Sequence, residues 1–420
     1  MKNWKIHIPP GVQDYLPDEC YNKRKIEEKI RRIFYLNGYD EIETPIFEYF
    51  DVFTGGKSSI EQEQMYKFFE IGGRILVLRP DNTMPIARIA ATKMKNASLP
   101  LRLSYISSIY RYEEMQYGKQ REVAQAGMEL LGVEGPEGDA EVISTAVQIL
   151  LELGLKEFQI DIGQVDFFKG LIEEAGLDEE QSEEIRSLID HKNMLGLEVL
   201  LRKFSFSSKV KEILLNLPKL YGNADMLKKA RNLSLSPRCR NAIDNLEEVY
   251  GIIQDYGLGN YITFDLGMVQ SLKYYTGMIF RGMTRELGYP ICAGGRYDGL
   301  ASDFGYDLPA TGFALGIKRI LMVLERQRAL EKIPGIDYLV VVDQNVRSIG
   351  YSRMQALRKA GNRVEYFIPS KECQDPLAYA RKKGIRRVLI VQARGTTEVV
   401  IDSLLDRVMD AKMNEGGETQ

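Results

Sequence analysis

The chain has 420 residues, of which 44% are apolar and 27% are charged, as in an ordinary globular protein. Its 56 Lys and Arg against 59 Asp and Glu give a net charge of −3, which excludes a protein that binds nucleic acid over a strongly basic surface. At roughly 150 residues per domain, this length predicts two or three domains.

The first part of the chain begins with an amphipathic helix and continues with strands. Ile26, Ile30, Ile33 and Phe34 lie at helical spacing, and Asn37-Gly38 is typical of a helix end. The segments that resemble strands are 75–78, 101–105, 158–162, 261–266 and 274–280, and a helix is expected at 317–324. This irregular order favours an α+β domain over residues 1–330, with a largely antiparallel sheet flanked by helices.

Two other regions have different patterns. A helix-rich stretch at about 167–255 interrupts the first domain, and 182–204 carries apolar residues at helical spacing. Ile333-Pro334-Gly335 is typical of a linker, and residues 335–410 then alternate strand and helix, which predicts a small α/β domain with parallel strands. Residues 335–409 carry 13 Lys and Arg and 8 Asp and Glu, a local charge of +5.

Few residues are available for metal or disulfide chemistry. The four cysteines are scattered without a CxxC pair, and the only histidines are His7 and His191, so no metal site and no cofactor are expected. The chain has no run of about 18 apolar residues, and its start lacks the apolar core of a signal peptide. We therefore expect no membrane span and a cytoplasmic location.

The first polar stretch of interest follows the strand expected at 75–78. Asp81 and Thr83 place a carboxylate beside a hydroxyl, which together can hold an ammonium group. The alternative is a turn that Asp81 caps, with Pro80 at its start.

The second stretch has the pattern of an antiparallel hairpin at 110–129. If Val123 packs on the opposite face, then Arg121, Gln125 and Glu129 share one face of a strand. Burial of such a face requires a polar ligand or mutual pairing. A solvated face with cross-strand ion pairs is the alternative.

Two later stretches combine glycines with tyrosines. Tyr274 and Tyr275 can offer one ring to a core and one hydroxyl to a pocket, although simple β-propensity also explains them. Gly294-Gly295 precedes Arg296-Tyr297-Asp298 and allows close approach of the backbone.

Taken in order, these stretches resemble the motifs of histidyl-tRNA synthetases, which are class II aminoacyl-tRNA synthetases. Residues 10–17 with 38–45 look like motif 1, the dimerisation element; 110–113 with 121–122 look like motif 2; 312–319 look like motif 3; 272–277 and 294–298 look like the two histidine-binding signatures. The resemblance covers nearly the whole chain. It implies the class II synthetase-like fold, with an inserted helical domain and a C-terminal domain similar to the anticodon-binding module.

The resemblance also implies roles for individual residues. It places Asp81 and Thr83 at the amino group of a bound histidine, and Gln125 and Glu129 as further walls of the pocket. Tyr274, Tyr275 and Tyr297 would shape the imidazole end. Arg111 and Arg319 match the arginines of motifs 2 and 3 that hold ATP; we group Arg111 with the histidine pocket, and Arg319, Lys119 and Gln270 with a vestigial nucleotide site.

The chain departs from the synthetase pattern where the phosphates of ATP would be held. Gln270 stands where the synthetases have an arginine that stabilises charge on the α-phosphate, and a neutral amide cannot replace a guanidinium group there. Loss of one such donor typically costs about 3–4 kcal/mol of transition-state stabilisation. Lys273, Lys119 and Lys318 replace the usual aspartate, arginine and glutamate, and Asp81 replaces a glutamate.

This combination resembles a synthetase paralogue, the regulatory subunit of ATP phosphoribosyltransferase. Residues 76–88 and 162–171 look like segments of that family, although Gln164 and Asp166 depart from it. The resemblance implies a non-catalytic subunit that is needed for the first step of histidine biosynthesis and binds histidine for feedback inhibition. It also implies a hetero-oligomer of a homodimer core with the short catalytic subunit, and tRNA is not an expected partner.

Two alternatives remain at this stage. A divergent histidyl-tRNA synthetase is favoured by the basic tail and the module similar to an anticodon-binding domain, and opposed by Gln270. A stand-alone sensor of tRNA or histidine would use the tail to bind nucleic acid. The charge of the tail is equally explained by a solvated helix face around Arg381, Lys382 and Lys383.

Overall fold

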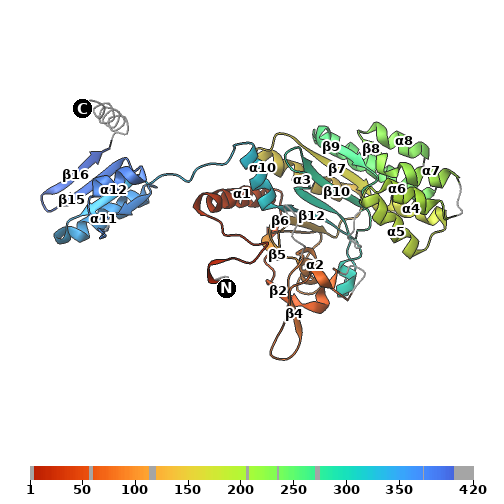
Figure 1. Cartoon of the computed structure of the whole chain (residues 1–420), viewed down its shortest axis with the longest axis horizontal. Coiled ribbons are helices and arrows are strands. Elements are labelled where there is room, and N and C mark those ends of the chain that lie inside the picture. The colour runs from red at the N-terminus through yellow and green to blue at the C-terminus, as the bar shows by residue number, and fades with distance from the viewer. Residues whose placement is uncertain are drawn as a thin grey trace, which may run out of the picture. The chain divides into compact units, whose positions relative to one another are not determined.

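The computed structural model describes residues 4–55, 60–112, 120–204, 208–233, 236–269, 275–371 and 373–401. The chain forms two compact units, Met1–Glu331 and Lys332–Gln420. Figure 1 shows the elements of each unit. Short 3-10 helices lie at Trp4–Ile6, Phe50–Val52, Gln62–Gln64, Leu217–Lys219, Gly259–Tyr261, Ala301–Phe304 and Gln344–Val346.

The first unit is built on a nine-stranded sheet with the order β1-β5-β6-β12-β11-β10-β7-β9-β8. Its strands are β1 (Asp40–Glu41), β5 (Leu101–Tyr110), β6 (Glu122–Leu131), β7 (Phe158–Gln164), β8 (Tyr221–Gly222), β9 (Ile262–Asp265), β10 (Met278–Thr284), β11 (Cys292–Arg296) and β12 (Ala310–Gly316). The central pairs are antiparallel, whereas β1 pairs with β5 and β7 pairs with β9 in parallel. The sheet is therefore mixed rather than wholly antiparallel.

Helices α1 (Pro17–Leu36), α3 (Pro136–Glu152), α9 (Pro237–Asp255) and α10 (Ile317–Arg326) contribute to the main core of this unit. The helical spacing of Ile26, Ile30 and Phe34 turns these side chains inward, where each is at most 4% exposed. They share this core with Met128 of β6 and Phe313 of β12. The helix expected at the start of the chain is therefore confirmed, and its core face is the predicted one.

A small sheet has the order β2-β4-β3, with β2 (Phe47–Tyr49), β3 (Lys67–Phe69) and β4 (Ile75–Leu78). Val77 of β4 belongs to a second core. Helix α2 (Thr83–Ala91) follows β4 and buries Met84, Ile86 and Ala87 in this core. Tyr105 of β5 and Ile279 of β10 belong to the same core. Arg79 donates through Nε to the Ser108 carbonyl of β5 at 2.8 Å, so the turn between β4 and α2 lies next to the large sheet.

Most of residues 165–255 are helical, and Figure 1 shows these helices grouped beside β7, β8 and β9. They are α4 (Val165–Ala175), α5 (Glu179–Asp190), α6 (Met194–Leu201), α7 (Ser208–Asn216), α8 (Asp225–Leu233) and α9. The single run expected at 182–204 is two helices, because Asn193 caps α6 by accepting a hydrogen bond from the Gly196 N–H at 2.9 Å.

The second unit contains a four-stranded sheet with the order β14-β13-β15-β16. Its elements are β13 (Tyr338–Val342), α11 (Arg347–Lys359), β14 (Val364–Tyr366), α12 (Pro376–Lys383), β15 (Arg387–Gln392) and β16 (Gly395–Val400). β13 is parallel to both β14 and β15, as the alternation of strand and helix predicts. The antiparallel strand β16 was not expected from the sequence.

The α+β fold class is confirmed, with two corrections to the elements. The strand expected at 274–280 is displaced: β10 begins at Met278, where its pairing with Gln164 of β7 starts, and ends at Thr284. Of the strand expected at 261–266, only Ile262–Asp265 form β9. Among the described residues, no helix is long and apolar enough to cross a bilayer.

Candidate functional site

A cavity of about 210 Å³ lies over β6, β11 and β12, next to the start of α2. The residues that the sequence singled out and that line this cavity are Asp81, Thr83, Arg111, Gln125, Glu129, Tyr275, Tyr297 and Arg319. They come from segments far apart in the sequence, and the sheet order brings them together. Lys119, Gln270 and Tyr274 lie outside the described residues.

Glu129 is the most deeply buried of these residues, with 1% of its surface exposed. The Thr83 hydroxyl donates to its Oε1 at 2.9 Å, and the Tyr297 hydroxyl donates to its Oε2. Burial raises the pKa of Glu129 from 4.5 to about 8, opposed by the bonds from Tyr297 and Thr83 and assisted by the charge of Asp81. The carboxyl group therefore holds a proton at neutral pH.

Two glycines make room for this buried group. A Cβ atom at Gly312 of β12 would collide with Glu129 Oε2, and one at Gly127 of β6 would collide with the Tyr105 hydroxyl. Tyr105 is 3% exposed and lies beside Thr83, and burial raises its pKa well above the ordinary value. Sequence reasoning missed Tyr105, because its place opposite Gly127 is set by the register of β5 and β6 and not by a local pattern.

Asp81 caps the turn before α2, which is one of the two roles that the sequence left open. Its Oδ1 accepts a hydrogen bond from the Met84 N–H at 3.0 Å and so caps α2. Its Oδ2 lies 3.6 Å from Arg111 Nη2, and Arg111 Nε donates to the Pro80 carbonyl at 2.7 Å. A carboxylate and a guanidinium group therefore stand side by side at the cavity.

Arg319 lines the cavity from α10 on another side. Its Nη1 donates to the Pro290 carbonyl at 2.5 Å, and its guanidinium group lies 5.2 Å from the centre of the Tyr289 ring. The neighbouring Lys318 donates to Gln13, and burial lowers its pKa. The N-terminal segment thus meets the start of α10 near this cavity.

The expectation that Val123 packs on the opposite face of its strand from Gln125 and Glu129 is wrong. Val123 lines the cavity together with both. The reason is the period of two, since residues with the same parity lie on one face of a strand. Arg121 places its guanidinium group 4.4 Å from the centre of the Tyr112 ring.

The sequence also missed the uncharged lining, which includes Ile109, Ile291, Cys292 and Phe313. Burial raises the pKa of the Cys292 thiol to about 12, so this sulfur is not a thiolate at neutral pH. Within the described part of the chain, no group of three or more His, Cys, Asp and Glu is placed to hold a metal ion. The arrangement suits a small ligand with both an ammonium and a carboxylate group.

Comparisons with known proteins show the family of the chain. Residues 11–320 match the family model described as histidyl-tRNA synthetase. The chain is 48% identical to the ATP phosphoribosyltransferase regulatory subunit of Acetivibrio thermocellus over 391 residues, covering 93% of this chain and 94% of the relative. The protein of the same name from Ruminiclostridium cellulolyticum is 45% identical, with coverage of 93% and 94%.

Solved structures give the same result. The crystal structure described as an ATP phosphoribosyltransferase regulatory subunit/histidyl-tRNA synthetase from Bacillus halodurans has a TM-score of 0.82 and 32% identity, and covers 92% of this chain and 98% of that chain. A histidyl-tRNA synthetase from Nostoc has a TM-score of 0.76 at 22% identity, with coverage of 97% and 99%, which shows the shared fold. The chain therefore belongs to the family of ATP phosphoribosyltransferase regulatory subunits, within the histidyl-tRNA synthetase family.

Proposed function

We propose that the chain is the non-catalytic regulatory subunit of an ATP phosphoribosyltransferase and binds free histidine for feedback control in the cavity over β6, β11 and β12. The observation that carries this proposal is that every described residue of the predicted site lines one cavity of about 210 Å³. A cavity of this size suits an amino acid better than a nucleotide, since most drug-sized ligands occupy about 300–1,000 Å³.

The charges and hydrogen bonds support one orientation of the ligand. Asp81 and Thr83 would receive the ammonium group, and Arg111, 3.6 Å from Asp81, would face the carboxylate. The imidazole would then lie toward Glu129 and Tyr297, because these form the buried end of the cavity. A neutral or ionised Glu129 can pair with an imidazole N–H or ring nitrogen, which a purely apolar side chain cannot do.

The absence of aminoacylation is proposed from sequence differences. Gln270, Lys273, Lys119 and Lys318 replace residues that the synthetases use around ATP. The names of the relatives describe a regulatory subunit of a phosphoribosyltransferase. A site that keeps the amino-acid contacts and alters the phosphate contacts fits a sensor of histidine.

We further infer that a catalytic phosphoribosyltransferase subunit of the short form assembles around a homodimer of this chain. Support for the homodimer comes from one face of the small sheet, where Phe47 is 54%, Tyr49 is 43% and Phe68 is 37% exposed. Clustered exposed apolar side chains of this kind mark interaction surfaces. The ligands of such an assembly are small metabolites, so we place the assembly in the cytoplasm. We also propose that residues 335–410 form a domain similar to an anticodon-binding module.

Calorimetric titration of histidine into the purified chain tests the proposal directly. We expect saturable binding that Asp81→Asn weakens at least tenfold, because it removes the charge opposite the ammonium group. Asp307→Asn makes the same change at an exposed residue away from the cavity and should bind as the wild type does. Absence of histidine binding, or equal weakening by both variants, would contradict the proposal.

A second candidate, a divergent histidyl-tRNA synthetase, is favoured by the family model and by the double name of the Bacillus halodurans structure. ATP–pyrophosphate exchange with histidine separates the two functions. We expect no exchange from this chain. Exchange at an ordinary enzymatic rate would establish the synthetase instead.

A further inference from the structure

The inner end of the histidine cavity contains a buried carboxyl group without a cation. Glu129 is 1% exposed and lines the cavity, and within the described part of the chain it forms no ion pair. Its partners are two hydroxyl groups, Thr83 at 2.9 Å from Oε1 and Tyr297 at Oε2. A hydroxyl group offers a hydrogen bond but no positive charge, so these contacts do not compensate fully for the burial of a carboxylate.

The other groups around Glu129 do not supply the missing positive charge. The titratable and charged side chains that line the cavity or act on its buried end are Asp81 before α2, Tyr105 of β5, Arg111 after β5, Tyr275 before β10, Cys292 of β11 and Arg319 of α10. Asp81 adds negative charge. Arg111 lies 3.6 Å from Asp81, and Arg319 donates to the Pro290 carbonyl at 2.5 Å, so both arginines are engaged with other groups.

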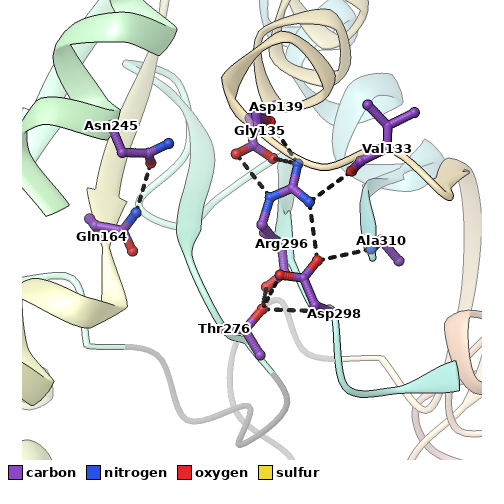
Figure 2. A network of polar contacts seen from close by, with 9 residues as sticks. All are labelled: Val133, Gly135, Asp139, Gln164, Asn245, Thr276, Arg296, Asp298 and Ala310. Atoms are coloured by element: carbon purple, nitrogen blue, oxygen red, sulfur yellow. Dashed lines mark hydrogen bonds and ion pairs between the residues drawn. The ribbon is translucent and has the colours of Figure 1, made fainter. Parts of the chain in front are cut away.

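The contact with Tyr297 is fixed by the neighbours of this residue in the chain. Arg296 forms ion pairs with Asp139 at 3.0 Å and with Asp298 at 3.1 Å, as Figure 2 shows. Asp298 also accepts a hydrogen bond from the Ala310 N–H at 3.0 Å. A buried network in which the partners are satisfied is rigid. Tyr297 is therefore held beside Glu129, whichever charge the carboxyl group has.

A carboxyl group in these surroundings holds a proton at neutral pH, and this proton needs an acceptor. Burial raises the pKa of Glu129 to about 8, and the negative charge of Asp81 acts in the same direction. Because Thr83 and Tyr297 both donate to the carboxyl oxygens, the acid O–H can donate into the cavity. The unprotonated nitrogen of a neutral imidazole ring is a suitable acceptor.

We propose that this cavity binds histidine together with one proton, held between the Glu129 carboxyl group and the imidazole ring, so that pH controls the binding. This inference rests on the histidine function proposed above. At neutral pH the proton comes from Glu129 itself: its O–H donates to the ring nitrogen, and no proton is exchanged with solvent. The Asp81–Arg111 pair would meet the ammonium and carboxylate groups of the ligand, so those charges cancel separately.

Charge balance favours one proton in this pair over two or none. With two protons, a buried imidazolium ion would face an uncharged acid. With none, a buried carboxylate would face an uncharged ring, and the ring would displace water that solvates the carboxylate in the unliganded protein. One proton leaves either a neutral pair or an ion pair, and in each the charges are compensated.

The proton balance of binding therefore changes with pH. Below about pH 6.5, the ordinary pKa of an imidazole, free histidine and Glu129 together hold two protons, and binding releases one. Between that value and about pH 8 they hold one, and binding exchanges none. Above about pH 8 they hold none, so binding takes one up and the affinity for histidine falls as pH rises. Feedback control by histidine would weaken in the same range.

Calorimetric titration of L-histidine into the full chain, in two buffers of different ionisation enthalpy, measures this proton uptake. A pKa of about 8 leaves about 90% of Glu129 protonated at pH 7 and about a quarter at pH 8.5. Glu129→Gln keeps a hydrogen-bond donor to the ring but does not titrate. At pH 8.5 the wild type should therefore take up about three quarters of a proton more than this variant. From pH 7 to pH 8.5 its affinity should fall about fourfold relative to the variant.

Glu134→Gln is the matched control, because it makes the same substitution at an exposed residue just after β6, and it should behave as the wild type does. Two results overturn this inference alone: equal proton uptake by the wild type and Glu129→Gln at pH 8.5, or uptake by the wild type that stays flat from pH 7 to pH 8.5. The second result is decisive even if Glu129→Gln does not fold, because it needs only the wild type. Absence of histidine binding at both pH values overturns the histidine function as well.

Discussion

Replacement of Glu129 by glutamine exchanges the buried titratable carboxyl group for an amide that does not titrate, and the size and shape of the side chain change little. The Thr83 and Tyr297 hydroxyls that donate to the carboxyl oxygens can rotate to accept from the new NH₂ group. At pH 6, where Glu129 is protonated because its pKa is about 8, the wild type and Glu129→Gln should therefore differ little in stability.

The difference grows with pH, and its sign follows from the two pKa values. The pKa is about 8 in the folded chain and 4.5 in the unfolded chain, so the folded state binds the proton more tightly. Below pH 4.5 both states are protonated and the group contributes nothing. Between the two values the free energy of unfolding falls by about 1.4 kcal/mol per pH unit, and above pH 8 it levels off. From pH 6 to pH 9 the wild type loses ~2–3 kcal/mol that Glu129→Gln retains.

Urea unfolding followed by circular dichroism at pH 6 and pH 9 measures this difference. The titration of all other groups is shared by the two proteins and cancels in the comparison. Glu248→Gln, which removes an exposed carboxylate from α9, is the matched control and should follow the wild type. Equal pH dependence of Glu129→Gln and the wild type would refute the argument, because it would mean that the buried carboxyl group is already ionised at pH 6.

The contacts of Glu129 and Arg296 lead to three further predictions. Gly312→Ala places a methyl group against Glu129 and should abolish histidine binding in calorimetry, whereas Gly288→Ala, with open space around it, should not. Tyr297→Phe removes a hydrogen bond to the carboxyl group and should weaken histidine binding by about tenfold, measured in the same titration. Arg296→Met leaves Asp139 buried without its cation, and the free energy of unfolding in urea should fall by about 3–5 kcal/mol.

Local patterns predicted the helices and the small α/β unit well, and long-range pairing poorly. The i, i+4 spacing of Ile26 and Ile30 is sufficient to predict which face of α1 is buried, because this spacing is a local feature of the sequence. The parallel pairing of β7 with β9 is not encoded in either segment, since almost 100 residues of helices separate them. The displaced start of β10 has the same cause: the tyrosines favour a strand, but the pairing with β7 decides where the strand begins.

The candidate site was predictable to the extent that its residues belong to recognisable motifs. Asp81, Glu129 and Tyr297 were selected by motif, and the structure places them around one cavity. Tyr105 and Val123 were missed or misplaced because they carry no distinctive chemistry of their own. Their contribution arises from position on the sheet, which becomes visible only when β5, β6 and β12 are in register.

The connection between Tyr297 and α3 would link the proposed binding of histidine to a second part of the buried core. Tyr297 donates a hydrogen bond to Glu129. The adjacent Arg296 forms an ion pair with Asp139 in the first turn of α3 and donates to the Gly135 carbonyl just before that helix. A ligand that ionises Glu129 strengthens the hydrogen bond from Tyr297, because a charged acceptor binds a hydroxyl more strongly than a neutral one. Any movement of Tyr297 toward Glu129 must then displace Arg296 or the start of α3, since close-packed interiors transmit displacement rather than absorb it. A regulatory subunit needs two arrangements of such a network, separated by the free energy that the ligand supplies, and no catalytic group.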